Sequence, residues 1–221
     1  ESIDAIYGAE ENGSRIRRVN VNLAPLSVEG FRRLKERNIG TFQLFQETYH
    51  RPTYGRFTLP GQKALLAGID DVGMGLLYGL YDWRFETLAL IATSRILRSG
   101  LGSAVIPSAC RIEPAIGSDL ASRPPYTLND QDFLKLVAIL RLAVPYTAYH
   151  VHSGKTGYPA ADAGTRRFPD FGGQRTNPGG YQESSQFEAA QFQLGDHRSL
   201  AEVIADLGQH KFIPSFCTGC Y

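Results

Sequence analysis

Residues 16–45, I-R-R-V-N-V-N-L-A-P-L-S-V-E-G-F-R-R-L-K-E-R-N-I-G-T-F-Q-L-F, predict a strand, a helix and a second strand in direct succession. In the first part, over 16–24, Asn20 and Asn22 alternate with valine and leucine, which is the period of a strand. Apolar residues then recur at helical spacing from Ser27, a natural N-cap, and a short strand follows. The stretch therefore predicts a βαβ unit.

The rest of the chain repeats this alternation of strand and helix. Further strands are expected over 41–45, over 69–77, before Arg111 and over 144–149, and further helices are expected from Trp83, over 130–143 and from Ser199. Short links between strands and helices favour parallel βα units, in either a barrel or a doubly wound sheet. Several strands end in polar residues, and barrel enzymes gather their chemistry at that rim, which favours the barrel.

Composition narrows the function classes. The chain has 221 residues, enough for one domain with a substantial core, and its net charge of +1 gives no electrostatic reason to expect nucleic acid or an acidic membrane as a partner. The sequence has no apolar run of the ~20 residues that span a bilayer, and no signal-peptide pattern at its start. We expect a cytoplasmic protein.

Polar side chains gather where the expected strands end. Gln46 and Glu47 open a segment rich in hydrogen-bonding groups, in which a carboxylate could bind two ribose hydroxyls; a solvated loop is the alternative. Asn20 and Asn22 share one strand face, which could be a ligand-lining face or merely a polar one. Arg111 could form a structural ion pair with Glu113, or part of an anion clamp.

The C-T-G-C stretch holds Cys217 and Cys220, two of the three cysteines of the chain. Three cysteines are too few for a disulfide scaffold, so a metal or redox role suits the spacing better. By itself the spacing fits zinc, an iron–sulfur cluster or redox chemistry. His197 could be a ligand or a base, but a lone surface histidine is the simpler interpretation.

Long strings of the sequence together resemble one family, the HydG-type maturases of [FeFe] hydrogenase, which are related to the 2-iminoacetate synthase of thiamine biosynthesis. The strings are R-R-V-N-V-N-L-A-P-L-S, G-T-F-Q-L-F-Q-E-T-Y-H-R, A-G-I-D-D-V-G-M-G, L-Y-G-L-Y-D-W-R-F-E, R-I-E-P-A-I-G, L-R-L-A-V-P-Y-T, R-T-N-P-G-G-Y, Q-L-G-D-H-R-S-L and I-P-S-F-C-T-G-C-Y. They lie in order over most of the chain.

The resemblance implies a radical S-adenosylmethionine (SAM) enzyme on a (β/α)8 barrel, in which a [4Fe–4S] cluster cleaves SAM reductively. It implies a tyrosine lyase that yields p-cresol and dehydroglycine, giving CO and cyanide for the hydrogenase, with other maturation proteins as partners. Carried over by position, Glu47 and Gln46 bind SAM, together with Asn20, Asn22 and Arg111. Likewise, Arg175 and Thr176 bind the substrate, L-tyrosine. Cys217 and Cys220 match two of three cysteines of an auxiliary iron–sulfur cluster.

The chain departs from the family pattern in ways that bear on activity. The CxxxCxxC loop of the SAM cluster is absent, and 152–155 reads H-S-G-K where the family has S-T-R-E. We expect an interior piece of the family protein, inactive alone, with about six of eight βα units in a partial barrel over 1–208. The auxiliary-cluster region is expected to start over 209–221. The alternatives are a 2-iminoacetate synthase and a cluster-free barrel that acts as a binding module.

Two windows, 91–110 and 149–174, match the family poorly, and a reading-frame error is our hypothesis for both. A shift of one base permits codons for the family's S-T-R-E in the second window, and the other offset permits its helix-and-strand pattern in the first. Both shifted windows rejoin the family at the correct point, before Arg111 and Arg175. On this hypothesis Cys110 is accidental, and divergence with an inserted loop is the alternative.

Overall fold

The computed structural model describes residues 1–54, 68–69, 71–101, 104–112, 117–145, 150–152, 200–209, 211 and 213. Its centre is a five-stranded sheet in which every neighbouring pair of strands is parallel. The strands follow chain order across the sheet: β3 (Val21–Asn22), β4 (Thr41–Gln43), β5 (Asp71–Tyr78), β6 (Ala104–Arg111) and β7 (His150–His152). This confirms the expected α/β class with parallel strands.

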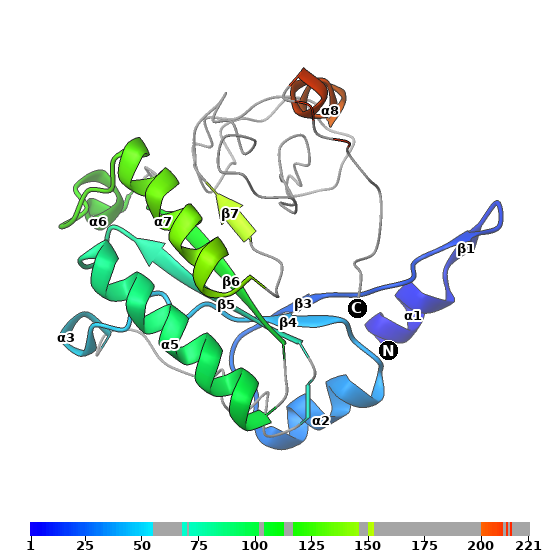
Figure 1. The fold of residues 1–221 in the computed structure, drawn as a ribbon. Coiled ribbons are helices and arrows are strands. Elements are labelled where there is room, and N and C mark those ends of the chain that lie inside the picture. Colours follow the sequence, from blue (N-terminus) through cyan, green and yellow to red (C-terminus); the bar gives the residue numbers. More distant parts are fainter. Residues whose placement is uncertain are drawn as a thin grey trace.

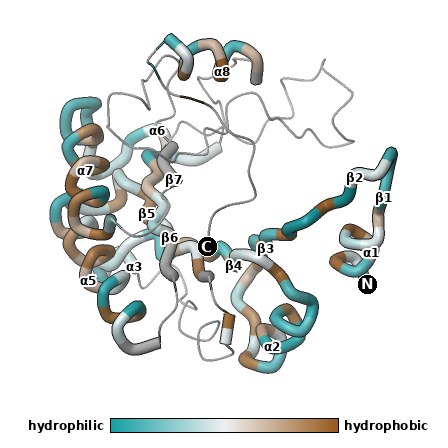
Figure 2. Tube along the Cα trace, turned by 45° about the vertical axis from the view of Figure 1, so that its right-hand side comes forward, coloured by the Kyte–Doolittle hydropathy of each residue, from teal (hydrophilic) through white to brown (hydrophobic). Residues whose placement is uncertain are grey.

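Three helices cover one face of this sheet: α2 (Val28–Glu36), α5 (Trp83–Leu101) and α7 (Asp130–Ala143). Phe31 of α2 meets Phe42 of β4 edge to face, with ring centroids 4.7 Å apart, and Phe42 pairs with Val72 of β5. Because side chains of paired residues point to the same face, α2 covers the face on which α5 and α7 lie. Figure 1 shows α5 and α7 side by side with α2 beyond the end of α5, and Figure 2 shows all three helices outside the strands.

The remaining described elements lie before, between and after these units. They are α1 (Ser2–Gly8), the hairpin of β1 (Glu10–Glu11) and β2 (Ser14–Arg15), α3 (Arg51–Tyr54), α6 (Asp119–Ser122) and α8 (Leu200–Gln209). None of the helices among the described residues is long and apolar enough to cross a membrane.

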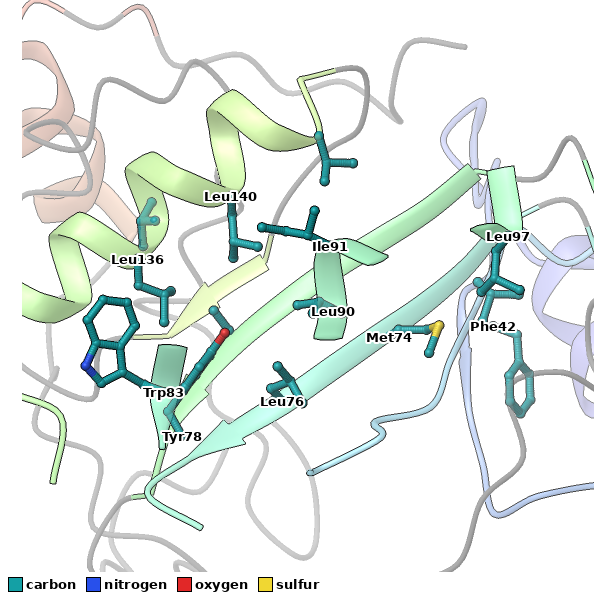
Figure 3. Packing of buried hydrophobic residues seen from close by; sticks show 14 of the residues in the cluster. Phe42, Met74, Leu76, Tyr78, Trp83, Leu90, Ile91, Leu97, Leu136 and Leu140 are labelled. Carbon is teal, nitrogen blue, oxygen red and sulfur yellow. The ribbon is translucent and has the colours of Figure 1, made fainter. Parts of the chain in front are cut away.

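The hydrophobic core fills the space between β5 and the helices. Four alternate residues of β5 are buried on that side and share one cluster with side chains of α5 and α7; they are Val72, Met74, Leu76 and Tyr78. Figure 3 shows Leu76 and Tyr78 of β5 on the side of the sheet where Leu90 of α5 and Leu140 of α7 lie. The opposite face of β5 carries Gly73 and Gly75, which are buried without side chains of their own. Side chains that could bind a ligand on that face must therefore come from neighbouring strands and from the strand ends.

Helices α2, α5 and α7 each begin at a side-chain cap, and the cap at Ser27 was expected from the sequence. The side chain of Ser27 accepts a hydrogen bond from the Gly30 N–H at 3.1 Å, and Asn129 Oδ1 accepts from the Asp132 N–H at 2.8 Å. Asp82 Oδ1 accepts from the N–H groups of Arg84 and Phe85, which starts α5 at Trp83. These bonds satisfy N–H groups that have no partner inside their helices.

The ends of some elements differ from expectation. The strand expected over 16–24 is reduced to Val21–Asn22, the two residues that pair with Phe42 and Gln43 of β4. In place of a strand over 144–149, α7 ends at Ala143 and β7 begins at His150, while 146–149 lie outside the described residues. The count of barrel units, and the domain boundary at 208, stay predictions.

The first window of the reading-frame hypothesis lies on α5 and β6. Ile91 and Leu97 are buried in the core, so this window supplies a suitable helix face. Pro107, in contrast, lies inside β6 and pairs with Met74, with β7 on the other side of the strand. Proline is unusual inside a strand with two neighbours, because it has no N–H to donate. The buried helix face suits this window and the proline inside β6 does not, and the hypothesis stays a prediction.

Candidate ligand site at the end of strand β4

The main chain makes an uncommon turn at Glu47. Glu47 has a φ of +64°, and the Thr48 N–H donates to the Gln46 carbonyl at 2.8 Å across it. A bond from residue i+2 to residue i across a positive φ is a γ-turn of the rare, strained kind. An L-residue other than glycine adopts this conformation only where its surroundings impose it.

Strand β5 supplies the first part of those surroundings. The N–H groups of Gln46 and Glu47 both donate to the Gly75 carbonyl, at 2.8 and 3.1 Å, and the Leu77 N–H donates to the Glu47 carbonyl at 2.9 Å. Glu47 thereby forms an isolated parallel bridge to Leu76. The chain of β4 is thus bound to β5 beyond its last regular residue, and its bulged end holds Glu47 at the carboxyl end of the strand.

Helix α5 supplies the second part through Glu86, in its first turn. The Thr48 hydroxyl donates to Glu86 Oε1, and the Tyr49 N–H donates to Glu86 Oε2 at 2.7 Å. The Glu86 side chain is 2% exposed. Glu86 is not among the residues expected from the sequence, because an acidic residue in the first turn of a helix is ordinarily explained by the helix dipole.

The Glu47 carboxylate is half-buried and, among the residues that the structure describes, has neither a hydrogen bond nor an ion pair. Burial raises the pKa of this carboxyl above its ordinary value. An unpaired carboxylate in partial burial is costly, so it is well suited to receive hydrogen-bond donors from a ligand. This is the strongest indication of a binding site among the described residues.

Cys110 of β6 lies close enough for the charge on Glu47 to affect it. Burial first, and the Glu47 carboxylate second, raise the pKa of the Cys110 thiol to about 12. The thiol is therefore protonated at neutral pH and a poor nucleophile or metal ligand.

Glycines on β5 leave room for side chains of β4. A Cβ added to Gly75 would lie 2.6 Å from the ring of Phe45, and one added to Gly73 would lie 2.9 Å from Gln43 Cγ. The ring of Phe45 therefore rests directly on the main chain of Gly75.

The predicted SAM-binding residues are not brought together at one point. Gln46 adjoins Glu47, and its Nε2 donates to the Thr48 carbonyl at 3.2 Å. Asn20 Oδ1 instead accepts from the Thr41 N–H at 2.9 Å, at the start of β4. Asn22 is exposed and pairs with Gln43, before the Glu47 turn. Asn20 therefore holds strands together, and ligand contacts from Asn22 stay a prediction.

Arg111 makes its described contacts with the helix layer. Its Nη1 donates to Asp130 Oδ1 at 2.6 Å, and its guanidinium carbon lies 4.6 Å from the ring centroid of Phe133, which belongs to the core beneath α7. Arg111 therefore forms an ion pair, and its partner is Asp130. Glu113, the partner considered from the sequence, lies outside the described residues. Cavity contacts from Arg111 stay a prediction.

The other candidate residues cannot be placed. Arg175, Thr176, His197, Cys217 and Cys220 lie outside the described residues. Within the described ranges, no group of three or more His, Cys, Asp or Glu side chains could hold a metal ion.

A cavity of about 340 Å³ lies beside the loop that follows β4. Two of its lining rings, those of His50 and Tyr81, are parallel, with centroids 3.6 Å apart. The described residues that line it are His50, Pro52, Thr53, Leu80, Tyr81, Leu120, Pro125 and Tyr126. Glu47 does not line this cavity. The evidence for a ligand site at Glu47 is therefore its unpaired carboxylate, and the cavity is a separate feature.

Two solved structures match the chain almost from end to end. The crystal structure titled HydG, a maturase of the [FeFe]-hydrogenase, is 38% identical, with a TM-score of 0.84 over 98% of this chain and 50% of that chain. The HydG of Carboxydothermus hydrogenoformans is also 38% identical, with a TM-score of 0.78 over 99% of this chain and 52% of that one. The chain is a relative of HydG.

Curated proteins of a second kind are matched at lower identity. The 2-iminoacetate synthases of Escherichia coli K12 and Salmonella typhimurium LT2 are each 25% identical, over 209 and 219 residues, or 86% and 89% of this chain. The chain spans about half the length of these relatives and of the HydG structures. No family model matches the chain. The expected resemblance to HydG is therefore confirmed, together with the relation to 2-iminoacetate synthase.

Proposed function

We propose that this chain contributes part of a radical SAM enzyme of [FeFe] hydrogenase maturation, and that Glu47 binds the ribose of SAM. Two observations support the proposal. The chain is 38% identical to HydG over nearly all its length, and the Glu47 carboxylate is unpaired at the carboxyl end of a parallel strand. That end of the strands is where barrel enzymes bind their ligands.

The arrangement suits a vicinal diol in particular. An ionised carboxylate has two oxygens that accept in parallel, and the two hydroxyls of a ribose donate in parallel. The turn at Glu47 is fixed on both sides by bonds to β5 and to Glu86, so the carboxylate is held in place before the ligand arrives. Gln46, beside it, offers an amide for a further contact.

The finer chemistry is proposed for the whole protein. With its [4Fe–4S] cluster, SAM would supply the radical that cleaves L-tyrosine to p-cresol and dehydroglycine, the source of CO and cyanide. Arg175 and Thr176 would hold the tyrosine, and Cys217 and Cys220 would hold an auxiliary iron–sulfur cluster. Other hydrogenase maturation proteins would be partners. Since the 221 residues contain no CxxxCxxC, we expect the chain alone to form no p-cresol from tyrosine and SAM.

The maturase is favoured over 2-iminoacetate synthase by the higher identity, 38% against 25%. A cluster-free barrel that acts as a binding module would share the fold. Glu47 could bind a ligand in either protein, so the 38% identity to HydG, and not Glu47, favours the enzyme.

The test compares two nucleosides that differ by one hydroxyl, 5′-deoxyadenosine and 2′,5′-dideoxyadenosine. Titrations followed by NMR should show the first binding about tenfold more tightly, since a lost charge-assisted hydrogen bond weakens binding by about that factor. In Glu47→Gln this ratio should fall close to one. Glu36→Gln, on the exposed last turn of α2, is the control and should keep the ratio. Equal binding of both nucleosides by the unaltered chain would refute the proposal.

A further inference from the structure

We infer that Glu86 is a positioning residue for the ligand site, which fixes the turn that presents the Glu47 carboxylate. This inference rests on the proposed function of Glu47. Glu86 belongs to α5 and is 38 residues from Thr48 along the chain, yet both of its carboxylate oxygens are bound to the segment directly after Glu47.

The contacts form a closed set around Thr48. Its hydroxyl donates to Glu86 Oε1 and accepts from the His50 N–H at 3.1 Å, while the Tyr49 N–H donates to Glu86 Oε2 at 2.7 Å. Thr48 is fully buried and Glu86 is 2% exposed. The three residues after Glu47 are thus each bonded, directly or through Thr48, to a single carboxylate.

A buried glutamate at position 86 lowers the stability of the fold, so support of the fold alone does not explain its presence. Both hydrogen bonds that the structure gives it come from uncharged donors of this loop, and within the described residues it has no ion pair. A buried carboxylate without a cation costs free energy even when it is hydrogen-bonded, and the amino end of α5 offsets only part of that cost. Its use is therefore better explained by what it positions.

What it positions is a strained turn. The φ of +64° at Glu47 persists only where the neighbouring bonds impose it. Before and at Glu47 these bonds go to Gly75 and Leu77 of β5, and after Glu47 they go to Glu86. Without Glu86 the chain is released on one side, the turn can relax to a negative φ, and the carboxylate direction changes.

The test uses the ratio of affinities for 5′-deoxyadenosine and 2′,5′-dideoxyadenosine, together with the midpoint of thermal unfolding. Glu86→Ala should reduce the affinity ratio from about ten to about two, because the Glu47 carboxylate is no longer fixed in the orientation that binds the ribose hydroxyls. Glu86→Gln can still accept from Tyr49 and bond to the Thr48 hydroxyl, and should keep most of the ratio. Ser94→Ala is the matched control: Ser94 is a buried residue of α5 whose hydroxyl, among the described residues, bonds only to the Leu90 carbonyl of the same helix.

Each outcome has one meaning. If Glu86→Ala unfolds more easily but keeps the ratio, as Ser94→Ala should, Glu86 is structural and the inference is wrong. If the unaltered chain binds both nucleosides equally, the proposed function of Glu47 is wrong, and the role of Glu86 falls with it. If Glu86→Ala does not fold, Thr48→Val removes the Oε1 contact together with the bond that the Thr48 hydroxyl accepts from the His50 N–H, and leaves the Tyr49 contact to Oε2 in place. It should lower the ratio by about threefold, and an unchanged ratio would overturn the inference.

Discussion

Arg111 and Asp130 form an ion pair of 2.6 Å that joins the last residue of β6 to the first residue of α7. The Arg111 side chain is 8% exposed and that of Asp130 is 45% exposed. The guanidinium also lies over the ring of Phe133, so it is bound by a charge and by an aromatic face. The pair fixes the start of α7 relative to the sheet.

Removal of the Asp130 carboxylate should therefore destabilise the fold. We expect Asp130→Ala to lower the free energy of unfolding by about 2 kcal/mol, since a nearly buried guanidinium loses its charged partner. Urea unfolding of Asp130→Ala, Arg111→Met and the double variant measures the coupling between the two residues. A coupling energy below about 0.5 kcal/mol would mean that the pair contributes no more than an exposed one.

Because the pKa of Glu47 is raised, replacing its carboxylate by a neutral group should increase the stability of the fold, by an amount that depends on pH. Because the folded pKa lies above the unfolded one, the ionised carboxylate destabilises the folded state, and stability is lost as the pH rises through both values. Glu47→Gln should therefore unfold at a higher temperature than the unaltered chain at pH 7, and this advantage should vanish below pH ~4. A constant difference across the pH range would exclude the titration of Glu47 as its cause.

Cys110 should be unreactive while the chain is folded. With a thiol pKa of about 12, very little thiolate exists at pH 8, and alkylation by iodoacetamide should need unfolding. Mass spectrometry of labelled peptides, with and without urea, measures this directly. Cys110→Ala should leave the labelling of Cys217 and Cys220 unchanged, and rapid native labelling of Cys110 would contradict the burial of its thiol.

A methyl group at Gly75 should strain the sheet. Its Cβ would lie 2.6 Å from the Phe45 ring, so we expect Gly75→Ala to cost about 1–3 kcal/mol of unfolding free energy. In a Phe45→Ala background the same change should cost much less, because the obstructing ring is gone. Gly8→Ala is the control, since a Cβ there meets no atom within 4 Å. Equal costs in both backgrounds would show that the ring is not the obstacle.

Local chemistry explains what could be predicted from the sequence. The helix starts at Ser27, Asp82 and Asn129 were predicted because a capping side chain bonds to an N–H only two or three residues away. Glu47 was selected because it follows a strand within a string shared with the HydG-type family. The partners of Arg111 and Asn20 were not predicted, since they lie on other elements.

The sequence by itself determined the alternation of strands and helices, the parallel α/β class and the relation to HydG. Only the tertiary structure decided that Glu47 bends the chain at positive φ, that Glu86 bonds the residues after it, and that Arg111 turns to α7. The physical reason is range. Periodicity and capping are set by neighbours in sequence, whereas a buried carboxylate takes its partners from whatever segment the packing of α5 on the sheet brings within 3 Å.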